Sequence, residues 1–121
     1  MHIIRSMPEG EDFELGGRGE RLFPVRGRPQ RLNPGDTVFF SHRGKIVGRS
    51  KLRDLRLVPD DDDMWYLEQG SPTNRGLYHY LCVGSIKAIR GGPSYVGRVG
   101  IRYIDNLSDK TLRKSLLELV L

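Results

Sequence analysis

The chain has 121 residues and a formal net charge of +5, and 15 of its 20 cations are arginines. This length fits one domain over residues 1–121 that needs no disulfides, and the single cysteine, Cys82, has no partner for an internal disulfide and is expected in the core. The chain contains neither a long apolar run nor a signal-peptide pattern, so we expect a cytoplasmic protein without a membrane span.

The charge is unevenly distributed along the chain. Residues 1–59 carry a net charge of +5, residues 60–80 carry −4 and residues 81–121 carry +4. The positive charge therefore falls on the two segments with structured patterns. A basic surface favours a polyanionic partner, of which nucleic acid is the commonest. The alternative is a generally basic domain without such a partner.

Two short strands are expected near the start of the chain. His2–Met7 predicts the first, which ends at Pro8, and a polar, glycine-containing loop follows. Leu22–Val25 predicts an edge strand, because the proline within it has no N–H to donate to a ladder.

The clearest local pattern is a hairpin in the middle of the chain. Asn33–Asp36 contains Pro and Gly at positions typical of a turn. Thr37–His42 is rich in β-branched and aromatic residues, Arg43–Gly44 forms a tight reversal, and Lys45–Ser50 returns. The returning strand can continue to Val58.

The last third predicts two more strands and a helix. A loop with four consecutive aspartates, 60–63, precedes the longest predicted strand, Tyr78–Ile89. Val96–Ile104 alternates apolar with polar residues, and Ser108 is expected to cap a closing helix. The predicted fold is mostly β (α+β): a small antiparallel pseudo-barrel with a C-terminal helix.

Familiar enzyme motifs are missing from the sequence. The three histidines do not lie at metal-ligand spacing, and no nucleophile elbow or phosphate-binding loop occurs. We therefore predict no catalytic residue, no metal site and no cofactor.

Basic residues at alternate positions predict a nucleic-acid-binding surface. Lys45, Arg49, Lys51 and Arg53 share one parity along the returning strand, and such residues would form a stripe on one face. The predicted phosphate-binding residues are Arg43, Lys45, Arg49, Lys51, Arg53, Arg98 and Arg102. Aromatic residues, among them Trp65 and Tyr95, are either stacking surfaces for bases or parts of the core.

The segment Leu32–Arg49, with its Pro-Gly-Asp turn, apolar strand and glycine-containing return, resembles the PUA-like superfamily, in particular its EVE and ASCH branches. The resemblance implies a pseudo-barrel with a cleft beside the first strand, in which a modified or flipped base of RNA or DNA would bind. The candidate residues for that base pocket are Arg5, Ser6, Phe40, Ser41, His42, Trp65 and Tyr95.

Two other functions stay open from the sequence. The resemblance also implies small amidohydrolases that act on modified nucleosides, although no catalytic set can be placed here. The third possibility is an accessory domain whose basic face meets an acidic protein partner.

Overall fold

The computed structural model describes residues 1–7, 21–26, 29–57, 78–97 and 100–120. The strands in these ranges are β1 Ile3–Ser6, β2 Arg21–Arg26, β3 Thr37–His42, β4 Lys45–Leu57, β5 Tyr78–Val83, β6 Lys87–Ala88 and β7 Gly100–Tyr103. A 3-10 turn, η1 Ile104–Asn106, and an α-helix, α2 Lys110–Glu118, follow. The predicted loop at 9–20, the acidic run at 60–63, Trp65 and Arg98 lie outside the described residues.

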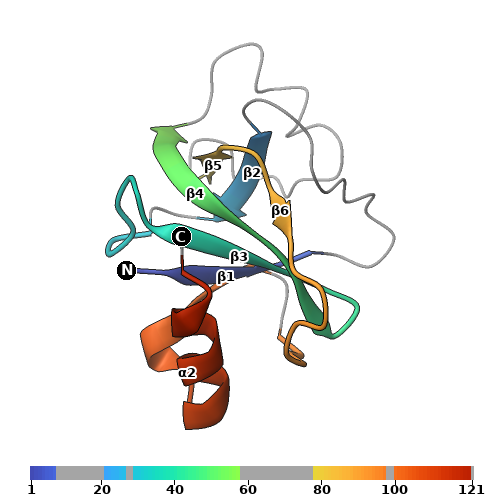
Figure 1. Ribbon diagram of the computed structural model, residues 1–121. Coiled ribbons are helices and arrows are strands. Elements are labelled where there is room, and N and C mark those ends of the chain that lie inside the picture. Colours follow the sequence, from blue (N-terminus) through green and yellow to red (C-terminus); the bar gives the residue numbers. More distant parts are fainter. Residues whose placement is uncertain (8–20, 27–28, 58–77, 98–99, 121) are drawn as a thin grey trace.

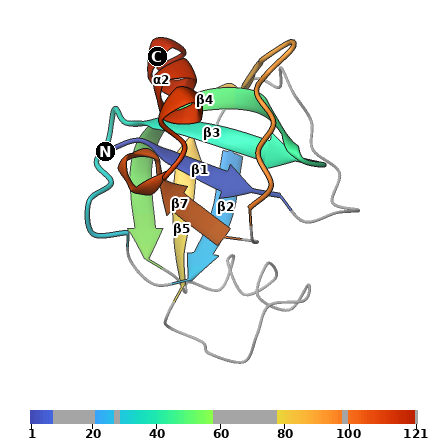
Figure 2. The same ribbon diagram turned by 90° about the horizontal axis from the view of Figure 1, so that it is seen from below.

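The strands form one curled sheet in the order β2-β5-β4-β3-β1-β7, and β6 pairs with β4 beside this path. Figure 2 shows how the sheet curls, so that the end strands β2 and β7 approach each other. The predicted mostly β, barrel-like architecture with a C-terminal helix is confirmed at this level.

The prediction of an antiparallel sheet is wrong for one central pair. β1 runs parallel to β3, with Ile3 opposite Val38 and Ser6 opposite Ser41, whereas the other ladders are antiparallel. Parallel neighbours need a crossover connection, and here the chain crosses through β2 at the far end of the sheet. The sheet is therefore mixed.

The predicted central hairpin is confirmed. The Asp36 N–H donates to the Asn33 carbonyl at 3.0 Å, and Gly35 takes a φ of 95°, which suits a residue without a side chain. The turn also pairs with β4, because Gly35 donates to the Leu52 carbonyl at 2.8 Å. The returning strand runs beyond Ser50 to Leu57.

The predicted strand Tyr78–Ile89 is not continuous. β5 ends at Val83, three residues without strand pairing follow, and β6 covers only Lys87–Ala88. The Ser50 hydroxyl lies at the break, 2.9 Å from the Gly84 carbonyl and 3.1 Å from the Ser85 carbonyl, to which it can donate. A side-chain hydroxyl thus serves backbone acceptors where the regular ladder stops.

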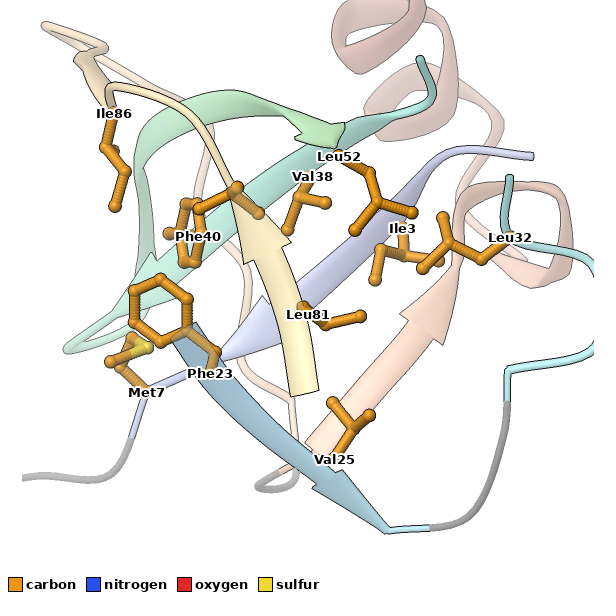
Figure 3. Close-up of a cluster of buried hydrophobic side chains, with 11 residues drawn as sticks. Ile3, Met7, Phe23, Val25, Leu32, Val38, Phe40, Leu52, Leu81 and Ile86 are labelled. Carbon is orange, nitrogen blue, oxygen red and sulfur yellow. The ribbon is translucent and has the colours of Figure 1, made fainter. Parts of the chain in front are cut away.

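Apolar side chains lie on both faces of the sheet. The inner cluster, on the concave face, is drawn in Figure 3 and consists of Ile3, Met7, Phe23, Val25, Leu32, Val38, Phe40, Leu52, Leu81, Val83 and Ile86. The outer cluster consists of Ile4, Phe39, Ile46, Tyr95, Ile104, Leu107 and Leu116. Figure 1 shows α2 beside β1 and β3, where its residue Leu116 joins the outer cluster. Cys82 is buried in β5, as expected of a core residue.

The end of the chain differs from the prediction in two details. β7 occupies only the later part of the predicted strand Val96–Ile104, and Val96 itself is 91% exposed. Asp109 rather than Ser108 caps α2, because its carboxylate accepts from the Leu112 N–H at 3.0 Å. Within the described ranges, no helix has the length and apolar character needed to cross a membrane.

Candidate functional site

A β-bulge in β4 divides the predicted basic stripe. Phe40 pairs with Gly48 but Ser41 pairs with Ile46, so Val47 is an additional residue on β4. An extra residue reverses the alternation of side chains beyond it. Lys45 and Arg49 therefore lie on opposite faces, and the prediction of one continuous stripe is wrong.

Arg49 connects the sheet to the closing helix. It pairs with Phe39 on the outer face, and its Nη1 donates to the Leu119 carbonyl, at the end of α2, at 2.6 Å. A cation at this end of a helix also compensates the partial negative charge of the last carbonyls. Arg49 thus has a structural contact in place of a side chain directed to solvent.

Three other cations converge on one depression, which we call the basic pocket. Its volume is about 530 Å³, and it lies between β4 and the connection from β5 to β6. Its lining residues are Ser50, Lys51, Leu52, Arg53, Gly84, Ser85 and Lys87. Lys51, Arg53 and Lys87 are exposed, and none of these described lining residues is acidic.

Arg53 reaches the basic pocket through a second bulge. Leu52 pairs with Val83 and Asp54 with Cys82, so Arg53 is the additional residue on β4. Its guanidinium lies against Gly84, where a Cβ atom would stand 3.1 Å from Nε and 3.2 Å from Nη2. The bulge aims the arginine, and the glycine leaves room for its planar head.

Lys87 was not among the residues predicted from the sequence. It follows the break after β5 and pairs directly with Arg49 of β4. Two positive charges in directly opposite positions add their potentials, so the electrostatic potential along this edge is more positive. Only the pairing of β6 with β4 brings Lys87 close to Lys51, so no local pattern could have identified it.

The remaining predicted cations lie away from the basic pocket. Arg43 and Lys45 are exposed at the tip of the hairpin, where Arg43 takes a φ of 51°. Arg102 is exposed on β7, with Ile101 and Tyr103 packed against the inner cluster on the other face, as the alternation predicts. None of these three cations lines the basic pocket.

The candidates for a base pocket are divided between the two faces of the sheet. On the concave face, Phe40 is fully buried and Arg5 is 6% exposed. The Arg5 guanidinium lies over the ring of Phe23, with Cζ 5.3 Å from the ring centroid, and its Nη1 lies 3.0 Å from the Met7 sulfur. This cation–π packing places Arg5 within the inner cluster.

The other candidates lie on or beside the outer face. Strand alternation places Ser6 and Ser41 there, opposite each other and both buried. Tyr95 belongs to the outer cluster and is 8% exposed, whereas His42 is half-buried and pairs with Lys45 at the end of the hairpin. The described candidates therefore do not converge on a single open cleft.

No group of three or more His, Cys, Asp or Glu side chains that could bind a metal ion occurs in the part of the chain that the structure describes.

Comparisons of the chain with protein-family models, with curated proteins and with solved structures find no match. The PUA-like resemblance thus stays a prediction from the sequence, and the basic pocket is the candidate functional site.

Proposed function

We propose that this chain binds nucleic acid and that the basic pocket contacts its phosphates. The observation that supports the proposal is the convergence of Lys51, Arg53 and Lys87 on one depression whose described lining holds no carboxylate. Arginine offers a planar fork of donors to phosphate oxygens, and lysine offers a compact charge. Together they suit a partner that presents closely spaced negative charges.

The proposal rests on phosphate contacts and not on base stacking. Phe40 and Tyr95, the described aromatic candidates, are too buried to stack with a base unless neighbouring side chains move. Recognition of a modified or flipped base, which the PUA-like resemblance implies, would require such a movement near the ends of β1 and β3.

Binding of labelled 12-nucleotide single strands, measured by fluorescence anisotropy between 50 and 200 mM salt, tests the proposal. Three phosphate contacts predict a slope of roughly −2 for log affinity against log salt, at about −0.7 per contact. The double variant K51A/K87A should lower this slope to roughly −0.7 and weaken binding at 50 mM salt by about tenfold, a loss near 1.4 kcal/mol.

A matched control separates the basic pocket from net charge. K110A/K114A removes the same charge from exposed lysines of α2, which do not line the basic pocket, and should bind nearly as the parent does. Equal weakening by both double variants would contradict the pocket as the binding site.

The same purified protein decides between the other functions. Failure to bind RNA or DNA at 50 mM salt would overturn the proposal. If an acidic protein co-purified instead, the accessory-domain hypothesis would gain support, and turnover of acylated cytidines would support the amidohydrolase hypothesis.

A further inference from the structure

The shape of the basic pocket distinguishes two kinds of phosphate. Lys51 and Arg53 come from β4 and Lys87 from β6, and all three border one depression. A surface that follows a nucleic-acid backbone spaces its cations along a groove, one for each successive phosphate. Here all three cations line one depression, which suits one group of high charge.

A terminal phosphate carries that charge. A phosphomonoester bears about −1.5 to −2 at pH 7 and presents three acceptor oxygens, whereas a phosphodiester within a strand bears one negative charge. A terminal group can also enter a depression end-on, because its chain continues on one side only. The volume of about 530 Å³ lies within the range of small-ligand sites, so a terminal nucleotide fits its size.

Arg53 lies on the side of the basic pocket that Gly84 forms. Its guanidinium lies against the backbone of Gly84, and the Gly84 N–H donates to the Lys51 carbonyl at 3.2 Å. The backbone of Gly84, against which the guanidinium lies, is therefore hydrogen-bonded to β4. A planar guanidinium presents parallel N–H donors that match two phosphate oxygens.

We propose that the basic pocket binds the terminal phosphate of an oligonucleotide in preference to its internal phosphodiesters. This inference rests on the proposed function, since it names the part of the nucleic acid that the same site takes. It assigns Arg53 to the phosphate oxygens through its paired N–H groups and assigns Lys51 and Lys87 to the remaining charge.

Three versions of one 12-nucleotide strand test the inference: with 5′-phosphate, with 3′-phosphate and with both ends hydroxylated. A competition of the hydroxylated strand with excess nucleoside monophosphate completes the set. At least one phosphorylated strand should bind about fivefold or more tightly than the hydroxylated strand, as one additional charge-assisted contact predicts. The nucleoside monophosphate should compete only weakly, because it lacks the contacts of the strand.

Two variants check that Arg53 makes the difference. R53K keeps the charge without the planar fork. G84A keeps Arg53 but adds a Cβ atom 3.1 Å from its Nε, so that the guanidinium must move by a few tenths of an ångström. Because the crowded atoms belong to the end of a flexible side chain, G84A should fold, which far-UV circular dichroism verifies. R53K should bring the preference for the phosphorylated strand close to onefold, and G84A should reduce it.

The outcomes separate the two proposals. Equal binding of phosphorylated and hydroxylated strands by the parent protein would overturn the terminal-phosphate inference and leave the proposed function intact. A preference that both R53K and G84A retain would also overturn it. Strong binding of the nucleoside monophosphate alone, with no gain from the strand, would assign the pocket to free nucleotides instead. No binding of any strand would overturn the proposed function itself.

Discussion

Asp36 links the central turn to the first residue of the chain. Its Oδ2 accepts from the Asn33 N–H at 2.8 Å and from the Met1 amino group, which also donates to the Arg31 carbonyl. Burial raises the pKa of the Asp36 carboxyl, but these two hydrogen bonds and the charges of the Met1 amine and His2 outweigh it. The pKa is therefore held below its ordinary value of 3.8, so the fold stabilises the carboxylate.

Replacing this carboxylate should lower stability in a pH-dependent way. We expect D36N to reduce the free energy of unfolding by about 1–3 kcal/mol at pH 7, since it removes the charge from two hydrogen bonds. A depressed folded-state pKa contributes stability that is complete above the unfolded pKa and is lost as pH falls through the folded value. Urea unfolding at pH 7, 5 and 3 should therefore show the difference from the parent narrowing at pH 3. A constant difference would contradict this account.

Arg43 stores local strain at the hairpin tip. Its φ of 51° and the φ of 80° at Gly44 are the pair of left-handed conformations that a two-residue reversal needs. Residues other than glycine, asparagine and aspartate are unfavourable in this left-handed region, because their Cβ atom crowds the backbone. The strand pairing on either side thus keeps Arg43 in a conformation that asparagine or glycine would adopt at lower free energy. The Arg43 side chain is exposed at the tip.

At the element scale, R43N should stabilise the β3–β4 hairpin. We expect the free energy of unfolding to rise by about 0.5–1 kcal/mol, because asparagine adopts the left-handed conformation at lower energy. Urea denaturation measures the change, with R43K as the control that keeps the strain and should differ little from the parent. A loss of stability in R43N would show that the Arg43 side chain makes a contact more valuable than the strain it imposes.

The contact between β4 and α2 depends on Arg49. Its Nε is buried without a hydrogen-bond partner among the described residues, so the short bond from Nη1 to the Leu119 carbonyl is the contact that compensates its burial. We expect R49A to lower the free energy of unfolding by about 1.5–3 kcal/mol. K51A, two residues along the same strand and exposed, should change it by less than about 0.5 kcal/mol. Similar losses in the two variants would contradict the structural role of Arg49.

Local pattern accounts for much of the fold at this scale. The turn at Asn33–Asp36, the hairpin and the alternation of Ile101, Arg102 and Tyr103 were predictable because each depends on neighbours in sequence. The break after Val83 was not, because three of its stabilising contacts come from Ser50 and Lys51, more than thirty residues away.

For the whole molecule, one sheet is covered by apolar side chains on both faces. The inner cluster fills the concave side, and the outer cluster needs α2 as its cover. Because α2 has only nine residues, packing rather than intrinsic helix stability must keep it folded.

Leu116 carries this packing, since it is the buried residue of α2. We expect L116A to lower the free energy of unfolding by about 2–5 kcal/mol, the usual range for a fully buried leucine. L117A, the adjacent and 47% exposed position, should change it by less than about 1 kcal/mol. Chemical denaturation of the two variants measures the difference. Equal effects would mean that the outer cluster does not depend on α2.

The sequence by itself determined the strand-rich class, the hairpin, the closing helix and the exposed position of Arg102, because turns, alternation and helical spacing are local properties of the chain. Only the tertiary structure decided the parallel pairing of β1 with β3, the bulges at Val47 and Arg53, and the gathering of Lys51, Arg53 and Lys87 around the basic pocket. The physical reason is that a strand's register and partner follow from packing between distant segments. A single extra residue in a strand reverses which face every later side chain meets. The same reversal divided the predicted basic stripe and placed Arg49 on the outer face, where it donates to the Leu119 carbonyl at the end of α2. The basic pocket is therefore the candidate site.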